Sequence, residues 1–385
     1  MRSINFFNKG DKSDMRIHYP DYNNSTANLA NSILKEFGIM AEKKPTLKLC
    51  DELLKKRYKN IVVLLLDGMG KNIMDRNLEQ DGFLKKHLVG TYSSVFPPTT
   101  VAATTSIDSA KNPIEHSWLG WDCYFKEIDK NVTVFLNTES GTEKQAAEYH
   151  VAGHYLPYQR IVDKINESGD GKAYYASPFM KPYPSDFSAI CVRIKKLCAQ
   201  AGKKYIYAYW NEPDSTIHKK GCYSIFTKSV LKELEEKIEA LCTSLEDTLV
   251  LITADHGLID SYGVTFTDYP EIMECLVHMP SIEPRALNLF VKSGMEQRFE
   301  QLFKEAFGEK FLLITKAQVR EQGLFGTGEE HPRFEEMLGD YLAIAVSDLS
   351  IYNSREEMER FIGVHAGLTE DEIVVPLVAV ECCTA

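Results

Sequence analysis

Short apolar runs alternate with amphipathic stretches along most of this chain. Apolar runs of this length, bounded by polar segments, are typical of strands buried on both faces of a parallel sheet. The predicted strands lie near 61–67, 204–210, 247–253, 286–291 and 340–347. The predicted helices lie near 100–109, 186–201, 224–244, 295–307 and 355–362. This alternation predicts an α/β fold whose mostly parallel central sheet carries helices on both faces.

The domain organisation follows from where this alternation is interrupted. No Pro/Ser-rich linker divides the 385 residues, so we expect one domain spanning 1–385. Residues 1–57 are polar and irregular apart from a helical stretch at Thr26–Phe37, and are expected to pack on the sheet as an N-terminal extension. Residues from about 113 to 183 are rich in aromatic and polar side chains. We expect this segment to form a small cap-like insertion over the carboxyl edge of the sheet.

Acidic residues stand where three of the predicted strands end. The run IVVLLLDGMG leads into Asp67, YIYAYWNEPD ends at Asp214 with His218 four residues on, and LVLITADHG ends at Asp255 and His256. Carboxyl ends of parallel strands share one edge, where open α/β folds bind ligands. A single acid after a strand is more often a helix cap. Carboxylates combined with imidazoles at this spacing instead predict a site for zinc or a similar divalent metal, and suggest a two-metal hydrolase.

Two further segments complete this prediction. GVHAGLTEDE offers His365 as a sixth ligand between small residues that allow close approach of the backbone. FPPTTVAATTS places Thr99 and Thr100 at the start of a predicted helix, where free backbone N–H groups favour anions. One of these hydroxyls is expected to be a nucleophile activated by a metal, and the other an N-cap.

In this order, the motifs LLLDGMG, FPPTTVAATTS, Asp-x-x-x-His, ADHG and a late Gly-x-His resemble the type I phosphodiesterase/nucleotide pyrophosphatase branch of the alkaline phosphatase superfamily, over roughly residues 60–375. The resemblance implies an alkaline phosphatase-like fold with two divalent ions, most often Zn²⁺, with Mn²⁺ as an alternative. It implies Thr100 as the nucleophile. It assigns Asp67, Thr100, Asp255 and His256 to one ion, and Asp214, His218 and His365 to the other.

The chain departs from this family beside the nucleophile. Many members carry an Asn that holds a phosphate oxygen, whereas EHSWLGWDCYFKE places Trp121 near that position. Lys126 or the backbone N–H of Thr100 is the expected substitute. Trp118 and Trp121 are candidates for stacking on a substrate, with core packing as the alternative. His150 and His154 lie outside the motif order and are interpreted as structural.

Composition restricts the partners and the location. A net charge of −11 disfavours nucleic acid polymers but allows a small phosphorylated substrate. The N-terminal segment has no apolar core of the kind a secretory signal needs, and no run reaches membrane-span length. Nine scattered cysteines without a CxxC pair indicate reduced thiols. We therefore expect a cytoplasmic protein that does not contact membranes; the sequence carries no signal for an oligomeric state.

The expected function is hydrolysis of phosphodiesters or nucleotide pyrophosphates through a phosphothreonine intermediate. No Arg lies between Arg76 and Arg160, and a monoanionic diester needs less positive charge than a dianionic monoester. The alternatives are phosphonate hydrolysis or phosphomonoester hydrolysis by the same kind of site. A more remote alternative is a binding module that keeps the metal ligands without turnover.

Overall fold

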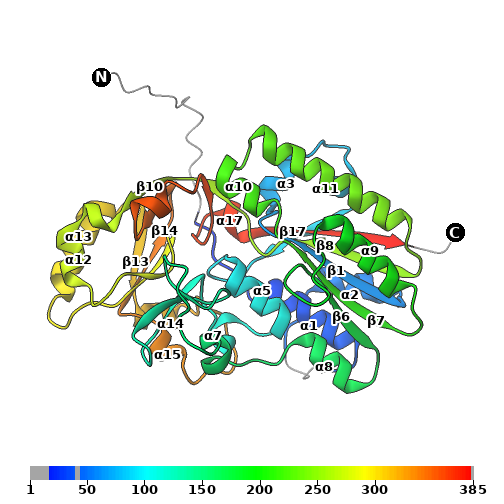
Figure 1. Ribbon diagram of the computed structural model, residues 1–385, viewed down its shortest axis with the longest axis horizontal. Coiled ribbons are helices and arrows are strands. Elements are labelled where there is room, and N and C mark those ends of the chain that lie inside the picture. The colour runs from blue at the N-terminus through cyan, green and yellow to red at the C-terminus, as the bar shows by residue number, and fades with distance from the viewer. Residues whose placement is uncertain (1–16, 40–43, 383–385) are drawn as a thin grey trace.

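A computed structural model describes residues 17–39 and 44–382 of the chain. A six-stranded central sheet covered by helices lies beside a second, seven-stranded sheet (Figure 1). Three strands of the central sheet, β1, β7 and β8, end just before Asp67, Asp214 and Asp255. This positions the candidate residues at one edge.

The central sheet has the strand order β2-β17-β8-β1-β7-β6. Its strands are β2 (Leu88–Ser93), β17 (Val374–Cys382), β8 (Thr248–Thr253), β1 (Asn60–Leu66), β7 (Lys204–Trp210) and β6 (Lys172–Ala176). β1 pairs in parallel with both β7 and β8, and β6 pairs in parallel with β7. β17 alone runs against its two neighbours, β8 and β2. Every residue of β1 is buried, as expected for a strand covered on both faces.

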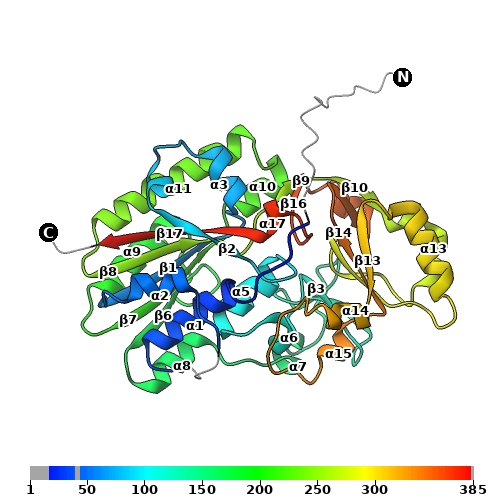
Figure 2. The same cartoon turned by 180° about the vertical axis from the view of Figure 1, so that it is seen from behind.

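Helices cover both faces of this sheet, as Figures 1 and 2 show from opposite sides. One layer contains α1 (Thr26–Glu36), α2 (Lys48–Leu54), α5 (Thr100–Ser109) and α8 (Ile161–Ser168). The other contains α3 (Lys71–Asn77), α4 (Phe83–Lys86), α9 (Phe187–Cys198), α10 (Asp214–Lys220) and α11 (Ile225–Thr243). The mostly parallel α/β architecture predicted from the sequence is therefore confirmed.

A second sheet differs from the sequence prediction. Its strand order is β13-β14-β12-β11-β3-β4-β5, and its pairs are antiparallel. Its strands are β3 (Asp122–Phe125), β4 (Lys130–Thr133), β5 (Thr138–Glu139), β11 (Ser281–Glu283), β12 (Ala286–Leu289), β13 (Phe311–Thr315) and β14 (Tyr341–Ala345). The strands predicted near 286–291 and 340–347 thus exist as β12 and β14 but pair outside the central sheet. An apolar run indicates a buried strand without specifying its sheet.

The segment 113–183, expected as a cap, contributes to both sheets. β3, β4 and β5 join the second sheet, whereas α8 and β6 pack into the central one. Two short ladders connect the remaining strands, a parallel one between β10 (Tyr262–Thr265) and β15 (Leu349–Tyr352) and an antiparallel one between β9 (Ile259–Asp260) and β16 (Gly363–Val364).

The remaining helices surround the second sheet and the site. They are α6 (Pro113–His116), α7 (Val151–Tyr155), the 3₁₀ helix η1 (Phe266–Asp268), α12 (Pro270–Cys275), α13 (Glu296–Phe307), α14 (Lys316–Glu321), α15 (Phe334–Met337), α16 (Arg355–Met358) and α17 (Glu370–Ile373). Among residues 17–39 and 44–382, no helix is both long and apolar enough to cross a membrane.

Candidate active site

Three strand exits meet at the carboxyl edge of the central sheet. Asp67 directly follows β1, Asp214 begins α10 after β7, and Asp255 follows β8. The Asp67 N–H donates to the carbonyl of Trp210 (2.9 Å), and the Asp214 N–H donates to the carbonyl of Asp67 (3.0 Å). Gly68 makes this contact possible: its φ is +72°, and a Cβ there would lie 2.9 Å from the Cβ of Asp214. The turn that exposes Asp67 therefore requires glycine.

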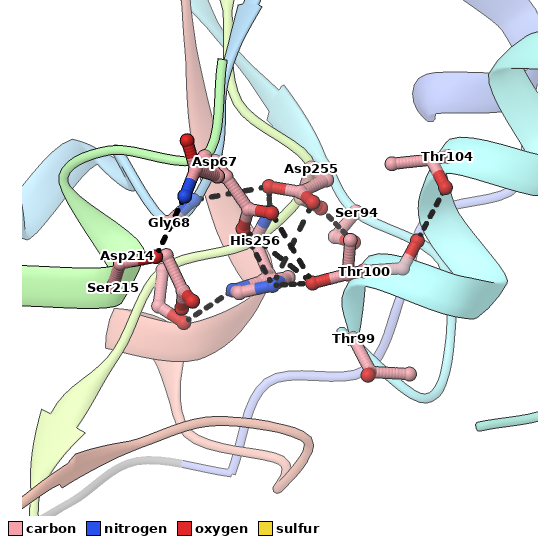
Figure 3. A network of polar contacts seen from close by, with 12 residues as sticks. Asp67, Gly68, Ser94, Thr99, Thr100, Thr104, Asp214, Ser215, Asp255 and His256 are labelled. Atoms are coloured by element: carbon pink, nitrogen blue, oxygen red, sulfur yellow. Dashed lines mark hydrogen bonds and ion pairs between the residues drawn. The ribbon is translucent and has the colours of Figure 1, made fainter. Parts of the chain in front are cut away.

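The first group of side chains surrounds the hydroxyl of Thr100, the first residue of α5 (Figure 3). Its Oγ1 lies 3.2 Å from Nε2 of His256 and 3.4 and 3.5 Å from the two carboxylate oxygens of Asp67. Nε2 of His256 also lies 3.4 Å from Oδ1 of Asp67 and 3.7 Å from Oδ2 of Asp255. These side chains are almost completely buried. The hydroxyl is thus held beside the carboxylate of Asp67 and the imidazole of His256, and Asp255 contacts that imidazole.

The second group joins α10 to the chain after β16. Nε2 of His218 lies 3.1 Å from Oδ2 of Asp214, and the other ring nitrogen, Nδ1, lies 2.7 Å from the carbonyl oxygen of Gly363. A Cβ on Gly363 would lie 2.4 Å from the side chain of Ile217, so a larger residue would push this segment away. His365 follows two residues later, and its ring is 5.4 Å from that of His218. The carbonyl contact orients His218 with Nε2 toward the site, as is usual for a metal-binding histidine.

Negative charge accumulates in the first group. Burial raises the pKa of Asp67 well above its usual value, the charges of Asp255 and Asp214 raise it further, and a hydrogen bond from the Tyr209 hydroxyl opposes this. Burial also raises the pKa of Asp255. Three buried carboxylates in one place are stable in ionised form only if positive charge neutralises them.

The second group behaves differently. Burial opposes ionisation of both Asp214 and His218, but their mutual attraction prevails, so the pKa of Asp214 is lowered and that of His218 is raised. Burial lowers the pKa of His365 well below its ordinary value, and His256 and His218 lower it further. His365 is therefore held as a neutral imidazole, the form that binds metals.

The donor atoms fit divalent metal ions. Two sets have ligand atoms within 4.8 Å of one another: Asp214, His218 and His365, and Asp67, Asp214 and His256. Oδ1 of Asp214, Oδ2 of Asp255 and Nδ1 of His365 are buried without a hydrogen-bond partner. Unpartnered buried acceptors of this kind are rare unless an ion or water satisfies them. Mixed carboxylate and imidazole donors suit zinc or another transition metal.

The family resemblance assigns Asp255 to the same ion as Asp67 and His256, but Asp255 is not in the close set of ligand atoms that contains these two residues. Its Oδ1 accepts from the N–H groups of Gly68 (3.1 Å) and His256 (3.0 Å), which leaves Oδ2 as its available donor atom. The close set contains Asp214 in its place. Asp214 lies between the two sets and is shared by both.

Thr99 occupies the N-cap position of α5, but its side chain does not cap the helix. Its hydroxyl donates to Oε1 of Glu283 (2.5 Å), and in Figure 3 it points away from the first group, whereas Thr100 points into it. The expected division of roles between the two residues therefore changes: Thr99 binds the second sheet instead of capping. The free N–H groups of the first helical turn remain available to an anion beside Thr100.

Two residues were missed by sequence reasoning. The hydroxyl of Tyr209 donates to Oδ2 of Asp67, and Glu283 bonds to Thr99. Tyr209 is one of three alternating tyrosines in β7, the others being Tyr205 and Tyr207, whose buried hydroxyls have no hydrogen-bond partner. The alternation places the three on the same face of β7. It does not indicate which of them reaches a ligand.

The three candidate substrate residues lie in different surroundings. Trp118 is only 6% exposed, its indole N–H donates to the carbonyl of Leu156 (2.8 Å), and it packs in a core cluster, so its ring is committed to packing. Trp121 is 38% exposed, and its backbone N–H donates to Glu283 (3.1 Å). Lys126 forms an ion pair with Glu336 at the surface. Of the three, only Trp121 is linked to the nucleophile segment, through Glu283, which also accepts from the hydroxyl of Thr99.

The other histidines and arginines considered are engaged elsewhere. Nδ1 of His150 accepts from the N–H of Gly153, and His154 packs on tyrosine rings. Arg160 pairs with Asp108, Arg333 with Glu127 and Glu336, and the buried Arg285 with Glu372. In the part of the chain that the structure describes, no Lys or Arg pairs with any of the candidate metal ligands.

Comparisons with known proteins identify the family and the fold. The family model for type I phosphodiesterase / nucleotide pyrophosphatase matches residues 61–294. An inactive variant of murine ectonucleotide pyrophosphatase / phosphodiesterase 5 in complex with AMP has a similar structure, with a TM-score of 0.63 and 14% identity over 83% of this chain and 87% of that one. Phosphonoacetate hydrolase from Sinorhizobium meliloti 1021 in complex with phosphonoformate is also similar, with a TM-score of 0.59 and 13% identity over 83% of this chain and 89% of that one. No curated protein matches the chain.

Proposed function

The chain belongs to the type I phosphodiesterase/nucleotide pyrophosphatase family, and from that membership we propose that it hydrolyses phosphodiesters in two steps through a covalent intermediate on Thr100. The observation that carries the proposal is the position of Oγ1 of Thr100, 3.2 Å from Nε2 of His256 and 3.4 Å from the nearer Asp67 oxygen. A hydroxyl surrounded by prospective metal ligands at a helix N-terminus has the surroundings of an activated nucleophile.

In the first step, Oγ1 of Thr100 forms a bond to phosphorus while the bond from phosphorus to the leaving oxygen breaks. The hydroxyl proton passes to the leaving oxygen, so that the leaving group departs as an alcohol or a phosphate. In the second step, a water oxygen bonds to phosphorus and the bond to Thr100 breaks, which restores the hydroxyl. The N–H groups at the start of α5 support this chemistry because they favour negative charge beside Thr100.

We propose two divalent ions, with zinc favoured. One ion would be held by Asp67, Thr100, Asp255 and His256, and the other by Asp214, His218 and His365. Bound there, divalent ions lower the pKa of a coordinated hydroxyl and offset charge on phosphoryl oxygens. The orphaned atoms on Asp214, Asp255 and His365 support this assignment.

The preference for diesters rests on charge. The described chain offers no Lys or Arg paired with the ligand set, and Arg160 and Arg333 are held by other carboxylates. A dianionic monoester would therefore lack a cationic partner beyond the metals. Trp121, exposed and linked to the nucleophile segment through Glu283, supports a site with room for a second substituent.

Phosphonate hydrolysis is the second candidate. It is favoured by the similarity in fold to phosphonoacetate hydrolase and by the expectation that Trp121 lies near the position where many nucleotide pyrophosphatases carry Asn. A threonine nucleophile with the same ligand set would serve this reaction as well.

From the cysteine pattern we also propose a cytoplasmic location.

A side-by-side assay tests the function. The purified protein, loaded with zinc or with manganese, is compared on bis-p-nitrophenyl phosphate, p-nitrophenyl phosphate and phosphonoacetate. We expect the diester to give the highest kcat/KM. Preference for the monoester or the phosphonate would overturn the diester assignment, and inactivity on all three would favour a binding module.

A further inference from the structure

Glu283 joins the nucleophile segment to the aromatic residue beside it. This residue ends β11 of the second sheet, and its Oε1 accepts both from the hydroxyl of Thr99 (2.5 Å) and from the backbone N–H of Trp121 (3.1 Å). Thr99 directly precedes Thr100, and Trp121 directly precedes β3. One carboxylate oxygen therefore connects α5, β3 and β11, three elements far apart in the sequence.

The backbone next to Glu283 is fixed by close packing. A Cβ on Gly120 would lie 2.7 Å from Cγ2 of Ile282 and 2.9 Å from its Cα, so the backbones of these two segments are in close contact. Ile282 has φ of +80°, a conformation that β-branched residues rarely adopt, and it pairs with Asp122 across the sheet. Strain of this kind persists where the surrounding structure enforces it, commonly at functional sites.

The Glu283 carboxyl group accepts two hydrogen bonds, and the charge of His218 favours its ionised form. Burial raises the pKa of Glu283 to about 8, against the hydrogen bonds from Thr99 and Trp121. Among residues 17–39 and 44–382, no Lys or Arg forms an ion pair with it, and Asp122 and Glu357 line the same surface cavity as Glu283. Its contribution is therefore an acceptor placed between two donors.

We propose that Glu283 is a positioning residue that sets the separation between the Thr99–Thr100 turn and Trp121, and thereby determines how well a diester with a large second substituent is used. This inference rests on the proposed function. A displacement of about 1 Å in a site of this type costs about 10²-fold in rate. Loss of the Glu283 hydrogen bonds to Thr99 and Trp121 should therefore lower turnover most for substrates that must fit between the Thr99–Thr100 turn and Trp121.

The test compares Glu283→Leu, which removes the acceptor, with Glu283→Gln, which keeps an acceptor oxygen. Glu357→Gln is the matched control, because Glu357 lines the same cavity and has no hydrogen bond to Thr99 or Trp121. The substrates are bis-p-nitrophenyl phosphate and methyl p-nitrophenyl phosphate, which share a leaving group and differ in the second substituent.

We expect Glu283→Leu to lower kcat/KM for the larger diester about tenfold more than for the methyl diester, mainly through KM, with metal content unchanged. Glu283→Gln should restore most of the difference, and Glu357→Gln should leave both substrates unaffected. Equal losses on the two substrates, or no loss, would overturn the proposal, because a merely structural role would not discriminate between them.

Two further measurements keep the test decisive. If Glu283→Leu does not fold, Thr99→Val removes the other half of the same bond and should show the same substrate discrimination. If the wild-type protein cleaves no phosphate ester, the proposed function fails, yet acrylamide quenching of Trp121 still reports on the bridge. Quenching should increase in Glu283→Leu relative to wild type and not in a Trp121→Phe background; unchanged quenching contradicts the positioning role.

Discussion

The imidazole ring of His365 stacks on that of His256, with ring centroids 3.9 Å apart and planes at 29°. The two rings belong to different sets of prospective ligands. The two ligand sets therefore meet at this pair of stacked rings. Replacing one histidine should leave the ring of the other in its own set. Nδ1 of His365 is buried without a hydrogen-bond partner, whereas Nδ1 of His256 lies 3.2 Å from the carbonyl oxygen of Gly257.

His365→Ala should empty the second metal site while the first is kept, because His365 is one of three residues in its set. Metal content, measured by mass spectrometry of the intact protein, should fall from two ions to one. Turnover should fall about 10²-fold, the scale of losing one electrostatic stabiliser of the transition state. His331→Ala serves as the control, because His331 accepts from the backbone N–H of Arg333 and belongs to neither ligand set. Two ions retained in His365→Ala would exclude His365 as a ligand.

Thr100→Ala should lower kcat about 10³-fold or more while metal content and melting temperature stay close to wild type. Thr100→Ser should keep part of the activity, since it retains a hydroxyl. Thr99→Ser, which preserves the donor to Glu283, should be nearly silent. If Thr99→Ser were the more damaging variant, the nucleophile would be misassigned by one residue.

Tyr209→Phe should weaken metal binding about 10- to 100-fold, because removing a hydrogen bond to a metal-binding carboxylate costs this much in other sites. Tyr207→Phe is a matched control on the same strand, since its buried hydroxyl has no hydrogen-bond partner. Competition with a fluorescent zinc chelator measures both. Equal affinities in the two variants would mean that the bond to Asp67 does not support a metal site.

The stability of the protein should depend on pH through Glu357. Burial, and then the charge of Asp122, raises the pKa of Glu357 from 4.5 to about 7. The folded state keeps this proton longer than the unfolded state, so the contribution to stability is present below pH 4.5 and is lost as pH rises to about 7. Glu357→Gln should remove this loss and melt about 2 °C higher than wild type above that range. A melting difference that is the same at pH 4.5 and pH 8 would contradict the assignment.

The sequence predicted the elements that carry the site because their signals are local. Asp67, Asp214 and Asp255 each follow an apolar run, and buried strands that end in an acid can be recognised without knowing what pairs with what. His218 was proposed as a ligand from its spacing of four residues after Asp214, and the structure places its Nε2 3.1 Å from Oδ2 of Asp214. His365 was found from the small residues around it.

The rest depends on contacts that the sequence does not encode locally. The sequence of β17 does not predict a central strand, because Pro376 has no backbone N–H to donate to a neighbouring strand. The second sheet joins β3, β11, β12 and β14 through pairings between distant segments. Glu283 and Tyr209 act through single side-chain bonds across such pairings, so only the folded chain shows them next to Thr99 and Asp67.

The central claim is that Thr100 carries the phosphoryl group during turnover, and the position of that group can be measured directly. The zinc-loaded protein is mixed with bis-p-nitrophenyl phosphate, quenched in acid during the steady state, digested and sequenced by mass spectrometry. The account predicts one phosphorylated residue, Thr100, which disappears in Thr100→Ala. Phosphate on Thr99 or on any other residue, or an unmodified chain while substrate is being turned over, would contradict it.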